Sequence, residues 1–253
     1  MAGRSAAAAE AEVHYRRMCE LAGMREGDLA AALQAEPAAW LESAARYGVA
    51  EAQLRLGQLL LDGEGAPRSA AAALAWFQRA AAQGLPEAMN MAGRCLENGW
   101  GGAVDLVEAA AWYRRAAEAG LDWGAYNYAN LLFDGRGVAQ DQAAACVWYA
   151  KAAAHGHARA MNLLGRCCEE GWGVARDPAA ARDWYRRSAE AGYFRAQYNH
   201  AALLAAEGRV ADAVRWFERA LTAAPAEARA SMAAALTRHP EPRLAALAQL
   251  RAA

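Results

Sequence analysis

The chain has 253 residues, of which 56% are hydrophobic and only seven are proline, and its formal net charge at pH 7 is −1. Its 27 basic and 28 acidic residues are spread along the whole length, which disfavours nucleic-acid binding because a phosphate-tracking surface needs clustered basic residues. No stretch reaches the roughly 18 apolar residues of a membrane span, and Glu10 and Glu12 interrupt the only segment that resembles a secretory signal. The composition therefore predicts a helix-rich cytoplasmic protein with no nucleic-acid and no membrane partner.

A period of 36 residues organises most of the chain. Single glycines recur at this interval, at Gly48, Gly84, Gly120, Gly156 and Gly192, and so do tryptophans, at Trp40, Trp76, Trp112, Trp148 and Trp184. Four of the tryptophans are followed by a second aromatic residue, at Phe77, Tyr113, Tyr149 and Tyr185. Paired glycines form a further series, with first members Gly63, Gly99, Gly135 and Gly171. A fixed period of this length is typical of repeat architectures.

The N-terminal part, residues 1–47, reads as helices that end in a degenerate capping repeat. Gly27 and Trp40 keep register with Gly63 and Trp76, but the other repeat positions drift over residues 12–48. Terminal repeats of such arrays are commonly atypical because they face solvent on one side.

Residues 48–192 contain four complete units, each predicted to form a helical hairpin. The segment EAMNMAGRCLEN has small or apolar residues at helical spacing and ends at paired glycines, and VDLVEAAAWYRRAAEAG does the same up to a single glycine. The aspartates before the second helices are expected to cap them: Asp105, Asp141 and Asp177. The adjacent aromatics Trp112 and Tyr113 are expected to fill the wedge toward the neighbouring unit, since one hairpin cannot bury its apolar face alone.

Residues 193–224 form a shortened unit, and residues 225–253 form C-terminal capping helices. Trp216 comes four residues earlier than the period predicts, so the loop within this hairpin is shorter. Two more helical stretches are expected near residues 226–237 and 241–251, where they would cover the last apolar face.

The repeat motif resembles the Sel-one-like repeat family, a relative of the tetratricopeptide repeats. The matching features are the Leu164-Gly165 pair, the G-x-G-V motif at 171–174, Asp177 and the Trp184-Tyr185 pair. The match covers residues 48–192, and the Leu-Gly pair departs from it as Tyr128-Ala129 and His200-Ala201. The resemblance implies an all-α fold, a right-handed α/α superhelical solenoid of tandem hairpins, and the role of a non-enzymatic adaptor in protein complexes.

By the same resemblance, the first helix of each hairpin lines a concave groove. Two rows on this helix carry polar or aromatic residues that could bind an extended or C-terminal acidic peptide: Asn90, Arg94, Tyr126, Asn130, Asn162, Arg166 and Tyr198. The alternative is a solvated polar face on which the arginines pair with Glu97, Glu169 and Glu170. Three tryptophans outside the repeat position are candidate exposed anchors, although each could equally pack over an adjacent turn: Trp100, Trp123 and Trp172.

No catalytic constellation is apparent, and the sequence predicts no metal and no cofactor. His155 and His157 lie near Cys146, but a histidine at a helix end more often makes a favourable dipole contact than a metal bond. The five cysteines lack CxxC spacing and favour buried thiols in a reducing compartment: Cys19, Cys95, Cys146, Cys167 and Cys168. Two functions remain as alternatives to an adaptor. An RNA-binding helical array would normally be basic, and a hydrolase would need a carboxyl group with a perturbed pKa in a closed pocket.

Overall fold

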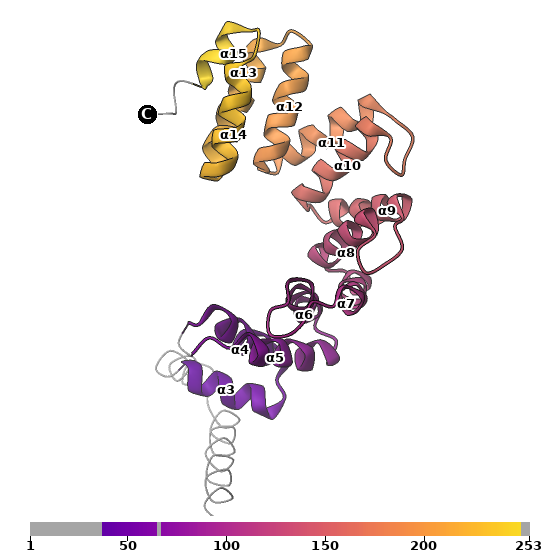
Figure 1. Cartoon of the computed structure of the whole chain (residues 1–253), viewed down its shortest axis with the longest axis vertical. Helices are drawn as coiled ribbons and strands as arrows, with labels where there is room; N and C mark the ends of the chain where they lie inside the picture. Colours follow the sequence, from indigo (N-terminus) through magenta and orange to yellow (C-terminus); the bar gives the residue numbers. More distant parts are fainter. Residues whose placement is uncertain (1–36, 65–66, 249–253) are drawn as a thin grey trace, which may run out of the picture. The chain divides into compact units, whose positions relative to one another are not determined.

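The computed structural model of the protein describes residues 37–64 and 67–248, with side chains from residue 41 onward. Every regular element in these ranges is an α-helix, as Figure 1 shows. Residues 1–36 of the predicted N-terminal helices, Cys19 among them, and the Trp40 side chain lie outside the described residues. Among the helices described, none combines the length and the apolar character that crossing a bilayer requires.

The helices belong to two compact units. The first unit runs to Gly124, with residues 136–138 added, and holds α3 (Pro37–Tyr47), α4 (Ala50–Asp62), α5 (Ala70–Ala82), α6 (Pro86–Asn98) and α7 (Leu106–Glu118). One cluster in its core joins residues of α4, α5 and α6, among them Leu61, Phe77 and Cys95. Within this unit the hairpin of α4 and α5 therefore shares its core with α6 of the next hairpin, as predicted for stacked repeats.

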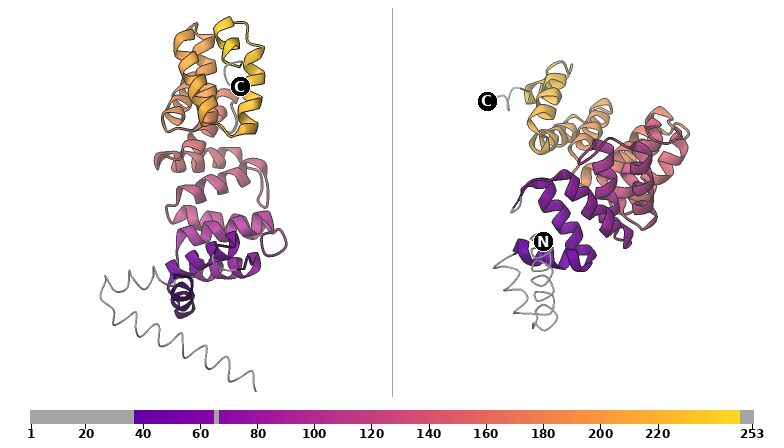
Figure 2. Two further views of the ribbon diagram at one scale, coloured as in Figure 1. Left: turned by 90° about the vertical axis from the view of Figure 1, so that its left-hand side faces the viewer. Right: turned by 60° about the horizontal axis from the view of Figure 1, so that its bottom comes forward.

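The second unit comprises residues 125–135 and those from 139 onward, and it repeats the hairpin arrangement. It contains most of α8 (Asp122–Asp134), then α9 (Gln142–Ala154), α10 (Ala158–Glu170), α11 (Pro178–Glu190), α12 (Phe194–Ala206), α13 (Val210–Ala223), α14 (Ala226–Thr237) and α15 (Pro242–Leu247). Only residues 207–209 link α12 to α13, which agrees with the predicted short loop. Leu236, Leu244 and Leu247 bury against Phe217 and Leu204, so α14 and α15 cover the apolar face of α12 and α13 (Figure 2).

The described residues confirm the all-α fold of tandem hairpins and the predicted caps. The carboxylates of Asp105 and Asp141 each accept a hydrogen bond from a main-chain N–H three residues later, at 2.9 and 2.8 Å. Asp177 accepts from the N–H groups of Ala179 and Ala180, both at 3.0 Å. These bonds fix where the second helix of each hairpin begins.

We expect the Asp177→Ala variant to unfold at a lower temperature than the native chain. An N-cap aspartate contributes about 1 kcal/mol, and here it satisfies two otherwise free N–H groups. Thermal unfolding followed by circular dichroism measures the loss. Asp183→Ala is the matched control, because this exposed carboxylate on the same helix makes only a surface ion pair with Arg186. Equal losses in the two variants would contradict the capping role.

Both aromatics of each pair pack in the core, but to different depths, and Trp76 and Trp112 lie against core clusters as partly buried residues. The fully buried aromatic is the residue that follows each tryptophan: Phe77, Tyr113, Tyr149, Tyr185 and Phe217. The repeat tryptophans before them are half-buried: Trp76, Trp112, Trp148, Trp184 and Trp216. A basic side chain three residues later lies over each indole, 3.7 to 4.5 Å from the ring centroid, at Arg79, Arg115, Lys151, Arg187 and Arg219. Successive helix positions are about 100° apart, so only one of two adjacent aromatics can face the hairpin interior.

The glycine of the Leu-Gly pair explains how the buried ring is accommodated. A Cβ atom on Gly165 would lie 2.8 Å from two ring atoms of Tyr185, and Gly93 has the same relation to Tyr113. The absence of a side chain on the first helix therefore lets the aromatic ring of the second helix lie against its backbone.

Candidate functional site

The two predicted groove asparagines are buried. Asn90 in α6 is 8% exposed and Asn162 in α10 is 4% exposed. The Asn162 amide oxygen accepts a hydrogen bond of 3.0 Å from the Asn199 amide, which joins α10 to α12. Little of either side chain is accessible, so Asn162 holds neighbouring first helices together instead of presenting a polar group to solvent.

The predicted arginines are exposed, and each lies over one of the predicted loop tryptophans. The Arg94 guanidinium carbon is 5.4 Å from the ring centroid of Trp100, and that of Arg166 is 5.0 Å from Trp172. Both indoles are half-buried. Trp100 packs against the core cluster around Phe77. The predicted groove arginines and the predicted loop tryptophans thus form two Arg–Trp pairs, Arg94 with Trp100 and Arg166 with Trp172.

The nearby carboxylates bind tyrosines of the second helices. Glu97 accepts a hydrogen bond of 2.7 Å from the Tyr113 hydroxyl and also pairs with Arg136 at 3.0 Å. Glu169 accepts from the Tyr185 hydroxyl at 2.6 Å. The alternative in which these carboxylates pair with Arg94 and Arg166 is therefore wrong for Glu97 and Glu169. Because their carboxylates are held elsewhere, the two arginines keep their positive charge facing outward.

The third hairpin makes the same type of bond with a different residue. The Asn130 amide oxygen accepts a hydrogen bond of 2.7 Å from the Tyr149 hydroxyl. The position equivalent to Glu97 is Phe133, whose ring meets Trp172 edge-on at 5.5 Å between centroids. Asn130, which replaces the arginine of the other repeats, thus supplies the acceptor that Phe133 lacks.

The remaining predicted aromatics differ in accessibility. Tyr126 is half-buried and stacks on His157 at 4.6 Å, and half-buried Tyr198 meets Phe217 edge-on at 5.0 Å. Trp123 is 43% exposed at the start of α8, which makes it the most accessible of the tryptophans whose side chains the structure describes.

One histidine caps a helix, and most cysteines of the described residues are buried. The His157 side chain is buried and accepts a hydrogen bond from the main-chain N–H of Ala160, so it caps α10. Cys95, Cys146 and Cys167 are buried thiols, as predicted, and Cys168 is half-buried. Burial raises the pKa of the Cys95 thiol to about 11. Within the described residues, no group of three His, Cys, Asp or Glu side chains is arranged to hold a metal ion.

We expect the chain to lose stability steeply once the pH rises above about 10, where tyrosines of the unfolded chain ionise. Burial raises the pKa of Tyr113, Tyr149 and Tyr185 in the folded chain, and the hydrogen bonds to Glu97 and Glu169 raise it further for the first and third. A raised pKa in the folded state means that the stabilisation is complete below the unfolded pKa and is lost as the pH rises toward the folded pKa.

Ultraviolet titration of the phenols beside circular dichroism tests this alkaline transition. The three buried phenols should ionise only together with loss of helix, and a Tyr185→Phe variant should show a shallower decline. Ionisation of all the tyrosines before any helix is lost would contradict the prediction.

The comparison with known proteins agrees with this architecture. A sequence model of the Sel1 repeat matches residues 50–85, 86–121, 124–157, 158–193 and 210–224. No curated protein matches the chain.

Solved structures share the fold. A protective antigen of uropathogenic Escherichia coli with an SLR fold is 25% identical, with a TM-score of 0.72, and the match covers 98% of this chain but only 54% of that protein. The chain thus spans about half of that relative. A Sel1 repeat protein from Oxalobacter formigenes is 26% identical, with a TM-score of 0.71, and the match covers 81% of this chain and 88% of that one. Together with the five matched repeats, these likenesses show that the chain belongs to the Sel1 repeat family.

Proposed function

We propose that this protein is a cytoplasmic adaptor that binds an acidic peptide or helix of a partner protein in a concave groove along the first helices of its hairpins. Sel1 repeats generally serve as protein-interaction scaffolds, which supports a binding role without catalysis. The helical hairpins supply rigid positions for side chains, so that little conformational entropy is lost when a partner binds.

The observation that carries the proposal is the pair of equivalent Arg–Trp contacts, Arg94 with Trp100 and Arg166 with Trp172. A guanidinium that lies over an indole is held in place by the ring while its N–H groups can bind a carboxylate with two hydrogen bonds. The Arg94 guanidinium also donates to the Met91 sulfur at 3.6 Å, a weak acceptor that a carboxylate would replace. Each pair therefore forms a preorganised site for an acidic side chain. The half-buried indole beside it adds apolar contact area.

The other predicted residues would support these two contacts. Tyr126 and Tyr198 offer half-buried rings, and Trp123 offers an exposed one, for apolar side chains of the partner. Asn130 would contribute the part of its amide that the Tyr149 hydroxyl leaves free. The buried Asn90 and Asn162 would act indirectly, by fixing the helices that carry the arginines.

Affinity capture followed by quantitative mass spectrometry tests the proposal. We expect partner proteins retained by the native chain to be lost, or to bind at least about tenfold more weakly, when Arg94→Ala and Arg166→Ala are combined. The reason is that each charged hydrogen-bonded contact contributes about 1.5–3 kcal/mol.

The matched control is the double variant Arg114→Ala/Arg186→Ala. These arginines are also equivalent positions two repeats apart, and they are exposed on second helices, where they make surface ion pairs. Retention of partners by this control and their loss from the Arg94/Arg166 variant would support the proposal. If both variants captured the same proteins as the native chain, the Arg–Trp sites would not be the binding surface.

A further inference from the structure

Two buried glutamines occupy equivalent positions four repeats apart, Gln53 in α4 and Gln197 in α12. They are 5% and 4% exposed. Each donates its amide hydrogen to the main-chain oxygen eight residues earlier, Gln53 to Ala45 at 3.0 Å and Gln197 to Ala189 at 3.3 Å. The donor half of both side chains is thus used in the same way.

The acceptor halves differ. The Gln53 amide oxygen accepts a hydrogen bond of 2.8 Å from the Gln83 side chain, seven residues after Trp76. Seven residues after Trp216, in the shortened unit, the chain has Ala223, which carries no donor. Accordingly, the buried Gln197 amide oxygen has no hydrogen-bond partner among the described residues. A buried acceptor without a partner is uncommon, because its loss of hydration is not compensated.

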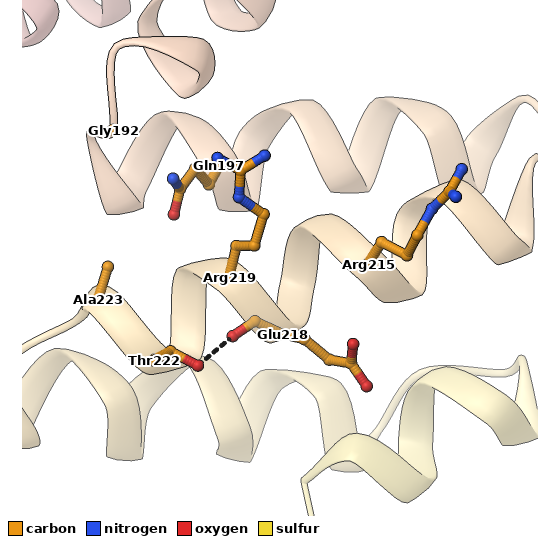
Figure 3. Close-up of a pocket in the computed structure, with 7 residues that line it drawn as sticks. All are labelled: Gly192, Gln197, Arg215, Glu218, Arg219, Thr222 and Ala223. Carbon is orange, nitrogen blue, oxygen red and sulfur yellow. Dashed lines mark hydrogen bonds between the residues drawn. The ribbon is translucent and has the colours of Figure 1, made fainter.

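Gln197 and Ala223 both line a surface cavity of about 440 Å³ between α12 and α13. Figure 3 shows Gln197 entering it from α12, with Ala223 and Arg219 on the facing helix. Gln197 therefore lines a space that a ligand can enter, while its unpaired amide oxygen is buried and would have to turn toward the ligand to be used.

The charge in this cavity favours an anion near Gln197. The Arg219 guanidinium carbon lies 4.4 Å from the Trp216 ring centroid, and no hydrogen bond or ion pair to its guanidinium occurs within the described part of the chain. Arg215 is already paired with Asp212. In Figure 3 Arg219 extends toward α12, whereas the Glu218 carboxylate points away from it. The Gln197 amide oxygen is thus an acceptor without a partner, and the Arg219 guanidinium has N–H donors without a partner among the described residues.

We propose that this cavity binds the free C-terminal residue of a peptide. The N–H group of that residue would donate to the Gln197 amide oxygen, and its carboxylate would accept hydrogen bonds from Arg219. An inorganic anion without an O–H group, such as sulfate, would engage Arg219 but give Gln197 no hydrogen, and a cation near Gln197 would face the Arg219 guanidinium. The inference rests on the proposed function, since it assigns a chemistry to one end of a bound partner.

The probes are N-acetyl-alanyl-alanine with a free carboxylate and the same dipeptide with a C-terminal amide. Titrations followed by two-dimensional NMR of the isotope-labelled chain report the Gln197 side-chain amide and the Arg219 guanidinium directly. We expect the carboxylate form to shift both signals and to bind at least tenfold more tightly than the amide form. Equal binding of the two probes, or no shift with either, would overturn the assignment.

Two reciprocal variants use the first unit as an internal standard. Ala223→Gln reproduces the Gln53–Gln83 arrangement, so it should occupy the Gln197 acceptor and weaken carboxylate binding at least tenfold. Gln83→Ala should do the opposite and create a second site, because Arg79 lies over Trp76 at 4.5 Å, as Arg219 lies over Trp216. Unchanged binding in both variants would contradict the proposal.

Arg219→Gln removes the positive charge but keeps a polar side chain in the cavity. It should therefore abolish the preference for the carboxylate probe over the amide probe. It also decides the question if Ala223→Gln fails to fold. Loss of this site leaves the Arg94 and Arg166 capture experiment unaffected, so a failed subsite and a failed adaptor function give different results.

Discussion

Replacing Gly173 by alanine is expected to destabilise the folded chain by about 2–4 kcal/mol, through backbone strain and overpacking together. Gly173 has a φ angle of +67°, which side-chain-bearing residues rarely adopt. A Cβ atom there would lie 2.7 Å from the main-chain nitrogen of Ala143 and closer still to the Gln142 carbonyl. Since α9 begins at Gln142, the second glycine of this loop packs on the first turn of the preceding hairpin's second helix. Chemical denaturation followed by circular dichroism measures the change.

Two other glycines separate the contributions of strain and contact. Gly156 has a φ angle of +86° but no atom within 4 Å of an added Cβ, so Gly156→Ala should show strain alone, about 1–2 kcal/mol. Gly102 has neither a positive φ nor a neighbour within that distance, and Gly102→Ala should be nearly neutral. If Gly173→Ala costs no more than Gly156→Ala, the close packing of loop on helix does not matter for stability.

The 36-residue period made most of the fold predictable from the sequence. Helix ends were predictable because glycine and aspartate mark them chemically, as at Gly171 and Asp177, where an αL C-cap and an N-cap are found. The short loop before α13 was predictable from the early position of Trp216. These features depend on local residue chemistry, which a sequence states directly.

The order of burial within the Trp-aromatic pairs was not predictable by the same reasoning. Trp184 and Tyr185 are both large and adjacent, and periodicity does not tell which one faces the first helix. The available signal was indirect: five of the six repeat tryptophans, all but Trp40, have a basic residue three positions later, as Arg187 follows Trp184. One helical turn places that cation above the indole, which favours a position at the surface.

The candidate sites required contacts that sequence spacing does not specify. Arg94 and Trp100 are joined only because the chain turns at Gly99, and Asn162 becomes buried through a partner on the next first helix, Asn199. The free acceptor of Gln197 depends on what is missing at Ala223. Alignment of the repeats would have indicated that difference, because Gln197 occupies the position of Gln53 whereas Ala223 occupies that of Gln83.

The adjacent aromatics of α11 allow the contribution of each ring to stability to be measured. We expect Tyr185→Ala to destabilise the chain by about 3–5 kcal/mol, because it removes a fully buried ring and leaves a cavity beside Gly165. Trp184→Ala should cost about 1–2 kcal/mol, since the indole is only half-buried and loses mainly its contact with Arg187. Chemical denaturation of both variants under one condition gives the two values.

Tyr185→Phe serves as the control that keeps the ring and removes the hydroxyl. It should cost only about 1 kcal/mol, the contribution of the hydrogen bond to Glu169, because Phe77 and Phe217 fill the same position in other repeats. A larger loss for Trp184→Ala than for Tyr185→Ala would restore the tryptophan as the main core residue. The opposite order would mean that the tryptophan keeps one face for the basic side chain above it, and that hairpin stability rests on the residue that follows.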